Sequence, residues 1–174
     1  MDCESNLVLI GMPSAGKSTI GVLLAKALGM DFLDTDILFQ SRYGKQLQTL
    51  IDENGLKTFL RMEEAVVLSL NARHTVIATG GSVIYSESAM RFLKKGGRVI
   101  HLDVPLYELE RRLSDAALRG IAMHPGQSLN SLYEERMPLY EWHADATIRW
   151  TDGAALEDMV AGLREETWAI NSME

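Results

Sequence analysis

Short strand-like segments alternate with longer helical ones along the chain. The strand-like segments are four or five residues long and centred on apolar residues, a pattern typical of parallel strands buried on both faces. They lie at residues 7–10, 31–34, 75–78, 99–102 and 146–150. Between them, apolar residues recur every three or four positions, which predicts amphipathic helices. These helices are expected at residues 19–28, 37–43, 47–52, 56–71, 86–95, 105–113 and 129–142, with a closing helix marked by Leu156, Val160, Leu163 and Trp168.

The alternation of strands and helices predicts the fold class. Crossover connections of this kind join parallel strands and place helices on both faces of one sheet. We therefore expect an α/β protein of three layers with a five-stranded parallel sheet. A chain of 174 residues suits a single domain, 1–174, and it contains no repeat or linker. Pro138 falls inside the helix predicted at 129–142 and is expected to kink it or break its hydrogen bonding.

The stretch from Gly11 to Ser18 reads G-x-x-x-x-G-K-S and stands between a predicted strand and a predicted helix. That context indicates a P-loop, whose glycines let backbone N–H groups face phosphate oxygens at the positive end of a helix. Lys17 would reach the β- and γ-phosphates, and Ser18 would bind Mg²⁺. A glycine turn that binds nothing is the alternative, which this context disfavours. The residues predicted to contact ATP are Gly11, Pro13, Ser14, Ala15, Gly16, Lys17, Ser18 and Thr19.

Two aspartates stand at the end of the strand predicted at 31–34, where ligands bind in open α/β sheets. Asp34 and Asp36 are two positions apart, so in an extended chain both side chains would point to the same side. One carboxylate near Mg²⁺ and one near an acceptor hydroxyl is an arrangement that suits phosphoryl transfer. The alternative is that Asp36 only caps the helix predicted from residue 37.

Two further segments could contact a ligand. Gly80 and Gly81 directly follow the strand at 75–78 and permit close approach to the backbone. Residues 114–128 form the least periodic internal stretch, without a stripe that faces a core. A mobile lid and a plain surface loop both agree with that composition. His101 lies inside a predicted strand, where a structural role is expected.

Composition excludes several functional classes. The formal net charge is −7, and no basic patch indicates a nucleic-acid partner. The single cysteine, Cys3, cannot form an internal disulfide. Asp2 and Glu4 stand where a secretory signal would be basic, and no apolar run approaches the ~18 residues of a membrane span. We therefore expect a cytoplasmic monomer with no membrane partner and a small-molecule substrate.

The motifs in this order resemble the shikimate kinase family, small P-loop kinases of the nucleoside-monophosphate-kinase type, over about residues 5–165. The P-loop alone is generic, whereas the Asp-Thr-Asp motif and the Arg-x-Pro-Leu-Tyr segment are more specific. The residues on which the resemblance rests are 11–18, 34–36, Phe59 with Glu63, Gly80-Gly81, Arg119 and 136–140. The resemblance implies ATP- and Mg²⁺-dependent phosphorylation of shikimate to shikimate 3-phosphate. It also implies the strand order 2-3-1-4-5 and a lid at about 114–128.

The resemblance implies roles on the nucleotide side. Lys17 would hold the phosphates and help to neutralise the transition state. Ser18 would bind Mg²⁺ directly, and Asp34 would support the ion through water. Arg119 would move with the lid onto the transferring phosphoryl group, and Arg112 would lie near the adenine.

It implies roles on the acceptor side as well. Asp36 would hydrogen-bond the acceptor hydroxyl and accept or orient its proton. Gly80 and Gly81 would present backbone N–H groups to the substrate, near Glu63. Arg136 would bind the substrate carboxylate.

Three positions depart from the family pattern. An arginine is expected after Phe59, where this chain has Leu60, so a charge is missing from the acceptor site. Arg61 is adjacent, but one residue along a helix turns by ~100°, so it is expected to face elsewhere. A three-glycine turn ends here in Ser82, and the usual proline of the lid is Gly120.

The missing arginine leaves other acceptors open. Glu63 lies three residues after Leu60 on the same helix face, and a carboxylate beside Arg136 would suit a zwitterion such as homoserine. Gluconate-like sugars and other hydroxy acids are further alternatives. A non-catalytic nucleotide-binding protein is a third class. A GTPase switch is the least supported, because residues 52–55 fit D-x-x-G but no N-K-x-D motif accompanies them.

Overall fold

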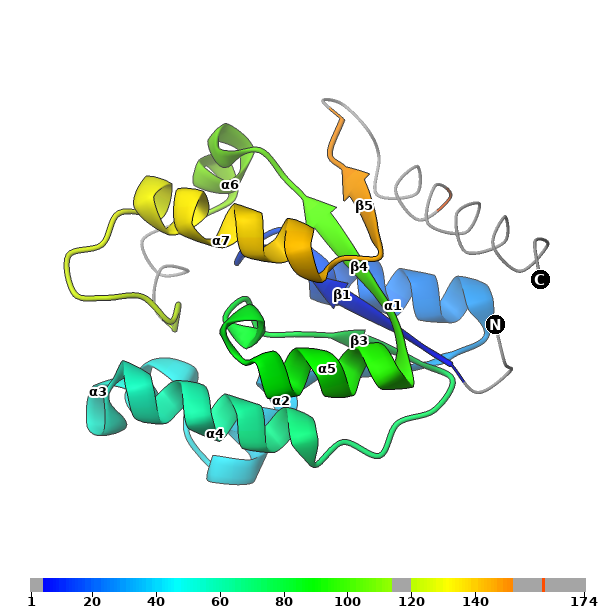
Figure 1. The fold of residues 1–174 in the computed structure, drawn as a ribbon, viewed down its shortest axis with the longest axis horizontal. Helices are drawn as coiled ribbons and strands as arrows, with labels where there is room; N and C mark the ends of the chain where they lie inside the picture. Colours follow the sequence, from blue (N-terminus) through cyan, green and yellow to red (C-terminus); the bar gives the residue numbers. More distant parts are fainter. Residues whose placement is uncertain (1–4, 114–119, 152–160, 162–174) are drawn as a thin grey trace.

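A computed structural model describes residues 5–113, 120–151 and 161 of the chain. Its five strands form one sheet in which every pairing is parallel, in the order β2-β3-β1-β4-β5 (Figure 1). The strands are β1 (Asn6–Ile10), β2 (Asp31–Asp34), β3 (Thr75–Ala78), β4 (Gly97–Asp103) and β5 (Ala146–Arg149). The α/β class and the strand order expected from the sequence are confirmed.

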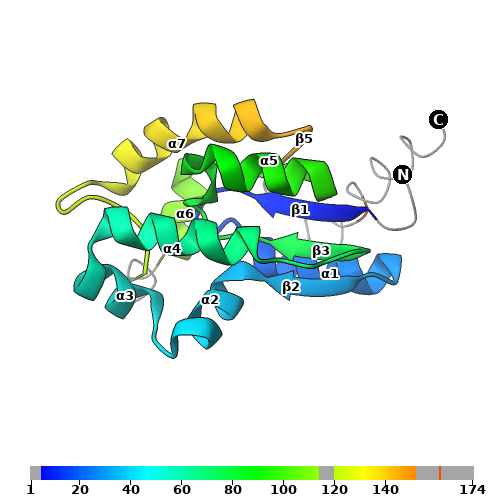
Figure 2. The ribbon, with the colours of Figure 1, turned by 60° about the horizontal axis from the view of Figure 1, so that its bottom comes forward.

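Helices cover both faces of the sheet (Figures 1 and 2). The helices are α1 (Lys17–Leu28), α2 (Thr35–Tyr43), α3 (Leu47–Asn54), α4 (Leu56–Leu68), α5 (Glu87–Gly96), α6 (Leu106–Arg112) and α7 (Leu129–His143). A short 3₁₀ helix, η1 (Val83–Tyr85), was not expected. One face packs against α1, and the other against α5 and α7, with α4 beside α5. The closing helix expected at 156–168 lies outside the described residues.

The burial of the strands follows from their positions in the sheet. The central strands β1 and β3 are buried at every residue, whereas β2 and β5 at the edges are partly exposed. A second, smaller cluster joins α2, α3 and α4 to residue 122 in the later part of the predicted lid. Its buried members are Phe39, Leu50, Phe59, Val66 and Ala122. Within residues 5–113 and 120–151, no helix is both long and apolar enough to cross a membrane.

Several predicted boundaries differ from the structure. Helix α2 begins at Thr35 rather than at residue 37, because the Asp34 carboxylate accepts hydrogen bonds from the N–H groups of Asp36 and Ile37. Helix α4 ends at Leu68 rather than at residue 71. Helix α7 continues through Pro138, so the proline removes one helical hydrogen bond without ending the helix. Pro138 lies on the exposed side of α7, where water can hydrogen-bond the carbonyl that the proline leaves free.

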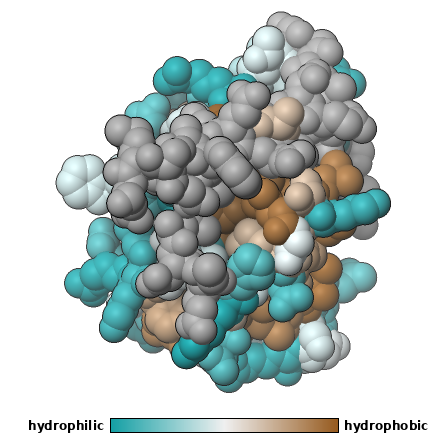
Figure 3. Space-filling view, turned by 90° about the vertical axis from the view of Figure 1, so that its right-hand side faces the viewer, coloured by the Kyte–Doolittle hydropathy of each residue, from teal (hydrophilic) through white to brown (hydrophobic). Residues whose placement is uncertain are grey.

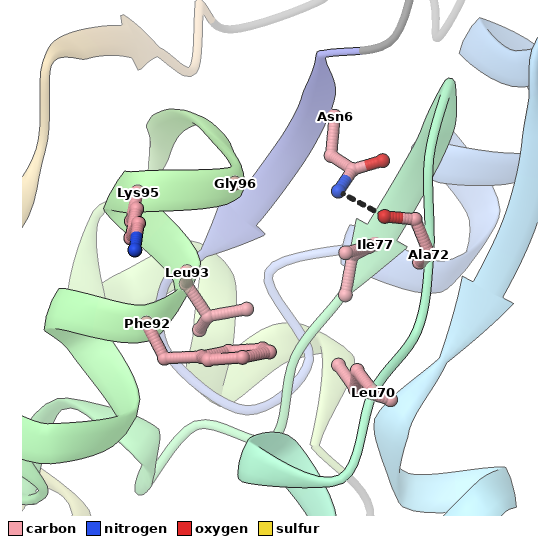
Figure 4. A pocket seen from close by; sticks show the side chains of 8 residues that line it. All are labelled: Asn6, Leu70, Ala72, Ile77, Phe92, Leu93, Lys95 and Gly96. Carbon is pink, nitrogen blue, oxygen red and sulfur yellow. Dashed lines mark hydrogen bonds between the residues drawn. The ribbon is translucent and has the colours of Figure 1, made fainter.

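A cavity of about 320 Å³ opens at the end of the sheet where the strands begin (Figure 4). Figure 3 shows this side of the molecule, where hydrophobic residues gather between hydrophilic ones. Most of the lining is apolar. Asn6 donates from Nδ2 to the carbonyl of Ala72 (2.8 Å) and accepts from the N–H of Thr75 (3.1 Å), so its amide is already satisfied. The candidate chemistry therefore lies elsewhere, at the carboxyl ends of the strands.

Candidate active site

The loop between β1 and α1 has the backbone geometry of a phosphate cradle. Gly11 and Gly16 have φ angles of 146° and 97°, which favour glycine. A Cβ atom at Gly11 would lie 2.7 Å from the carbonyl oxygen of Leu102. Gly16 is the N-cap of α1 and offers no side-chain cap, so the first N–H groups of the helix remain available to an anion.

Lys17 lies within this cradle and is 9% exposed. Its Nζ donates to the carbonyl oxygens of Gly11 and Met12, both at 2.8 Å. Burial disfavours the ammonium and lowers the pKa of Lys17 to about 8, although the nearby Asp36 carboxylate acts in the opposite direction. The side chain is therefore mostly cationic at neutral pH and lies where phosphate oxygens would meet the loop.

Ser18 and Asp34 offer oxygen ligands beside the loop. Ser18 Oγ donates to Asp34 Oδ2 at 2.6 Å, while Asp34 Oδ1 accepts from the N–H of Asp36 at 2.9 Å. Hydroxyl and carboxylate oxygens are the ligands that Mg²⁺ prefers, so this pair fits the ion. The residue that caps α2 is Asp34, and the suggestion that Asp36 is the cap is wrong.

Asp36 and Glu63 converge on Gly80. A Cβ atom at Gly80 would lie 2.7 Å from Asp36 Oδ1 and would also collide with Glu63 Oε1, so only glycine fits between the two carboxyls. Asp36 lies in the first turn of α2, so the expectation that it extends from the strand in line with Asp34 is wrong. The turn of the helix directs it towards Gly80 instead. The N–H of Gly80 donates to Thr35 Oγ1 at 3.0 Å, so this donor is engaged within the protein.

Both carboxyls have raised pKa values. Burial raises the pKa of Asp36 to about 6 against the opposing charge of Lys17. Burial raises the pKa of Glu63 to about 7, although Ser82 Oγ donates to Glu63 Oε2 at 2.8 Å and favours the charged form. Buried acids with perturbed pKa values are typical of catalytic sites. Asp36 can therefore take up a proton near neutral pH, whereas Glu63 is partly neutral there.

Arg136 brings a buried cation to the same place from α7. It is 1% exposed, and its Nη1 would lie 3.1 Å from a Cβ atom at Gly81. Its Nε donates to the hydroxyl of Tyr85 at 3.1 Å, and its Nη2 donates to the carbonyl of Ala122. Tyr140 of the same helix donates to the carbonyl of Gly81 at 2.6 Å. The loop after β3 thus joins the carboxyls on one side to the guanidinium on the other.

Leu60 lines a cavity of about 200 Å³ next to this cluster. Glu63 and Ser82 line the same cavity, so Leu60 lies beside the candidate acceptor position. Arg61 also lines it, so the expectation that this side chain faces elsewhere is wrong. Lys57 and Tyr85 complete one side and were not selected from the sequence, because no local pattern marks them.

A second cavity, of about 570 Å³, borders the P-loop. Its lining includes Gly16, Lys17, Ser18 and Thr19, together with Arg112 and Trp150. Arg112 donates from Nη1 to the carbonyls of Ser14 and Ala15, both at 3.3 Å, and its guanidinium carbon lies 4.2 Å from the centre of the Trp150 ring. The space and the flat groups beside it suit a nucleotide base. Trp150 was not selected from the sequence.

Pro13 brings the P-loop against the loop after β3. Its Cδ would lie 3.1 Å from a Cβ atom at Gly81, so the tip of the P-loop contacts the loop after β3. His101 lies beneath the P-loop and stacks on Tyr140, with ring centres 5.1 Å apart. Burial lowers the pKa of His101 to about 4, so the ring is neutral at pH 7.

The predicted lid is only partly described. Residues 114–119, and with them Arg119, lie outside the described residues. Between 120 and 128, the N–H of Gly120 donates to Gln48 Oε1 at 2.7 Å, and Ile121 and Ala122 are buried. Single residues of this stretch therefore reach the interior although it has no apolar stripe, because Ala122 packs into the cluster with Phe39 and Phe59.

The chain is similar to known proteins along most of its length. A family model described as shikimate kinase matches residues 13–165. A shikimate kinase of Thermobifida fusca is 38% identical over 143 residues, covering 81% of this chain and 83% of the relative. A shikimate kinase of Vibrio vulnificus is 37% identical over 155 residues, covering 87% and 90%.

Solved structures give the same result. Shikimate kinase from Acinetobacter baumannii in complex with shikimate has a TM-score of 0.86 at 30% identity, covering 95% of this chain and 93% of that chain. Shikimate kinase from Aquifex aeolicus has a TM-score of 0.75, also at 30% identity, covering 91% and 94%.

Proposed function

Because this chain belongs to the shikimate kinase family, by the family match and by relatives 37% and 38% identical, we propose that it phosphorylates shikimate with ATP. The product would be shikimate 3-phosphate. The observation that carries the proposal is the convergence of Asp36, Glu63 and Arg136 around Gly80 and Gly81, next to the P-loop. This cluster has an acid–base group and a carboxylate-binding group at one place.

The chemistry follows from the positions of these groups. The acceptor hydroxyl oxygen forms a bond to the γ-phosphorus while the bond from that phosphorus to the β–γ bridging oxygen breaks, which releases ADP. Asp36 takes up the hydroxyl proton, and Lys17 neutralises charge that develops on the phosphoryl oxygens. Ser18 and Asp34 would hold Mg²⁺, which supplies further charge neutralisation when it is bound. Arg136 would pair with the acceptor carboxylate, and Arg119 would act as a further cation at the phosphoryl group.

The charge state of Glu63 bears on the acceptor. A zwitterionic acceptor would need an ionised Glu63 to pair with its ammonium group. Burial raises the pKa of Glu63 to about 7, so keeping this carboxyl ionised to pair with an ammonium group costs free energy. This observation favours shikimate, which has a carboxylate and hydroxyls but no amine, over homoserine.

An acceptor screen tests the proposal. Purified protein with ATP and Mg²⁺ is assayed for ADP release with shikimate, homoserine and gluconate, and the product is identified by phosphorus NMR. We expect rapid ADP release and a phosphate ester with shikimate only. Faster turnover of homoserine or gluconate would contradict the proposed acceptor. ADP release that no acceptor stimulates would favour a nucleotide-binding protein without kinase activity.

A further inference from the structure

Tyr85 stands between two charged side chains of α7. It is the last residue of η1, just after the glycine loop, and is half-buried. Its hydroxyl accepts a hydrogen bond from Arg136 Nε at 3.1 Å and donates one to Glu135 Oε1 at 2.6 Å. The guanidinium carbon of Arg136 lies 5.2 Å from the centre of the Tyr85 ring. One phenol therefore contacts Arg136 by a hydrogen bond and by its aromatic face.

Glu135 extends this contact to the segment before α7. Its second oxygen accepts from Gln127 Nε2 at 2.7 Å, and Gln127 Oε1 accepts from the N–H of His124 at 3.0 Å. Both oxygens of an exposed carboxylate are thus engaged, one by Tyr85 and one by Gln127. A chain of hydrogen bonds connects residue 124 to the buried guanidinium.

These contacts determine which part of Arg136 remains for a ligand. A guanidinium has five N–H donors in one plane. The Tyr85 hydroxyl takes the Nε donor, and the carbonyl of Ala122 takes one from Nη2. The Nη1 group faces Gly81 at the candidate acceptor site, where the hydroxyl of Tyr140 also interacts with the guanidinium. The plane of the guanidinium is consequently set before a carboxylate arrives, which reduces the entropy lost on binding.

We propose that Tyr85 and Glu135 are positioning residues that orient Arg136 for the acceptor carboxylate. Because the Tyr85 hydroxyl donates to a carboxylate, its lone pair is the better acceptor for Arg136, as hydrogen bonds in a chain strengthen one another. The inference deepens the proposed function and rests on it. Neither residue touches the reacting atoms, so the expected effect is on acceptor affinity.

The first test is Tyr85→Phe, which keeps the ring and removes the hydroxyl. We expect KM for shikimate to rise about tenfold, the effect of one charge-assisted hydrogen bond. The kcat and the KM for ATP should stay within about twofold of wild type. Glu135→Gln keeps an acceptor for Tyr85 but removes the charge, so it should raise the same KM by a smaller factor. Glu134→Gln is the matched control, because Glu134 is exposed and contacts Asn130 instead; it should leave all constants unchanged.

A second arm separates positioning from a general structural effect. The same variants are assayed with an analogue in which a carboxamide replaces the shikimate carboxylate. If Tyr85 acts through the grip of Arg136 on the carboxylate, the ratio of wild-type to Tyr85→Phe kcat/KM should fall towards one for the analogue. An equal loss with both acceptors, or a loss confined to kcat or to ATP affinity, would overturn the inference. A Tyr85→Phe protein with wild-type constants would overturn it as well.

If Tyr85→Phe does not fold, the comparison of Glu135→Gln with Glu134→Gln tests the inference. Their kcat/KM values are measured with shikimate and with the carboxamide analogue. Wild-type protein that leaves shikimate unphosphorylated would remove both the proposed function and this inference. Normal wild-type activity together with unchanged variants would remove only the inference.

Discussion

The nucleotide half and the acceptor half of the candidate site are built in different ways. The phosphate-binding part of the nucleotide half is one contiguous loop, residues 11–18, that uses backbone groups and two glycines with positive φ. The acceptor half collects buried side chains from α2, α4, the loop after β3 and α7. The first depends on local chain geometry and the second on packing between segments far apart in sequence. A single-residue difference, such as Leu60 in place of the family's arginine, can therefore alter the acceptor half and leave the nucleotide half unaffected.

The two halves also differ in electrostatics. In the nucleotide half, the Lys17 ammonium is satisfied by carbonyl oxygens of its own loop. In the acceptor half, two carboxyls share a buried space, and burial raises the pKa of both. We therefore expect changes in the nucleotide half to act through transition-state charge, and changes in the acceptor half to act through binding and protonation.

Lys17→Met should have the largest effect. Lys17 is placed for the charge that develops during phosphoryl transfer, so its loss should lower kcat by about 10³-fold or more. The fold should remain, because the replacement is an apolar side chain of similar length at a buried position. Steady-state assays and circular dichroism measure the two effects. Activity within about tenfold of wild type would contradict the assignment.

Asp36→Asn tests the acid–base group of the acceptor half. The change keeps the shape and removes the base, so kcat should fall by about 10²-fold or more, with little change in ATP affinity. Titration with ATP in the presence of Mg²⁺ provides the second measurement. A variant that binds ATP weakly but retains kcat would assign Asp36 to the metal, and thus to the nucleotide half.

Leu60→Arg adds a charge to the acceptor half alone. A second charge-assisted contact contributes about 1.5–3 kcal/mol, so KM for shikimate should fall about tenfold to hundredfold. KM for ATP should not move, and any activity towards homoserine should decrease because a cation would face its ammonium group. Leu60→Met, which keeps an apolar side chain, is the control. If Leu60→Arg leaves KM for shikimate unchanged, Leu60 does not face the acceptor.

Glu63→Gln should have the smallest effect, on stability. Burial raises the folded-state pKa of Glu63 from 4.5 to about 7, so between these values the folded protein binds more protons than the unfolded chain. The contribution of Glu63 to the free energy of unfolding is then full below about pH 4.5 and decreases as the pH rises towards 7. Glu63→Gln should therefore stabilise the protein at pH 8 by about 1–3 kcal/mol and hardly at all at pH 4.

Urea denaturation at the two pH values measures the difference. Glu64→Gln, the same change at the next position of α4, controls for the substitution itself. A Glu63→Gln variant no more stable than wild type at pH 8 would show that Glu63 is ionised without penalty in the folded protein. The acceptor half would then resemble the nucleotide half in having fully compensated charges.

The sequence predicted the sheet because strand and helix periods are local signals. It placed β2 and β3 at their observed bounds, and the P-loop motif lies where the structure has a loop between β1 and α1. It misjudged Asp36, because the Asp34 cap starts α2 two residues earlier than the apolar pattern indicates. The capping side chain of Asp34 determines where the helix begins and therefore where the Asp36 side chain points. The spacing of apolar residues does not show where a cap lies.

In the acceptor half, Asp36, Gly80 and Gly81 were predictable from their positions at strand ends, and other residues only where the family resemblance marked them. Arg136 and Glu63 came from that resemblance, whereas Tyr85 and Ser82 show their roles only through contacts with residues 51 and 19 positions away. The raised pKa of Glu63 likewise depends on burial that no local sequence pattern specifies. Long-range packing of this kind is the part of the site that sequence reasoning could not supply.

Trp150, which stacks on Arg112 beside the P-loop, gives the protein an intrinsic fluorescent probe. The indole lines the cavity proposed for the nucleotide, so its emission should respond when a base occupies that space. Trp142, by contrast, is 77% exposed on α7, and replacing it with phenylalanine removes a solvent-exposed background signal. Nucleotide binding can then be followed by tryptophan fluorescence in the unlabelled protein, without an acceptor and without turnover.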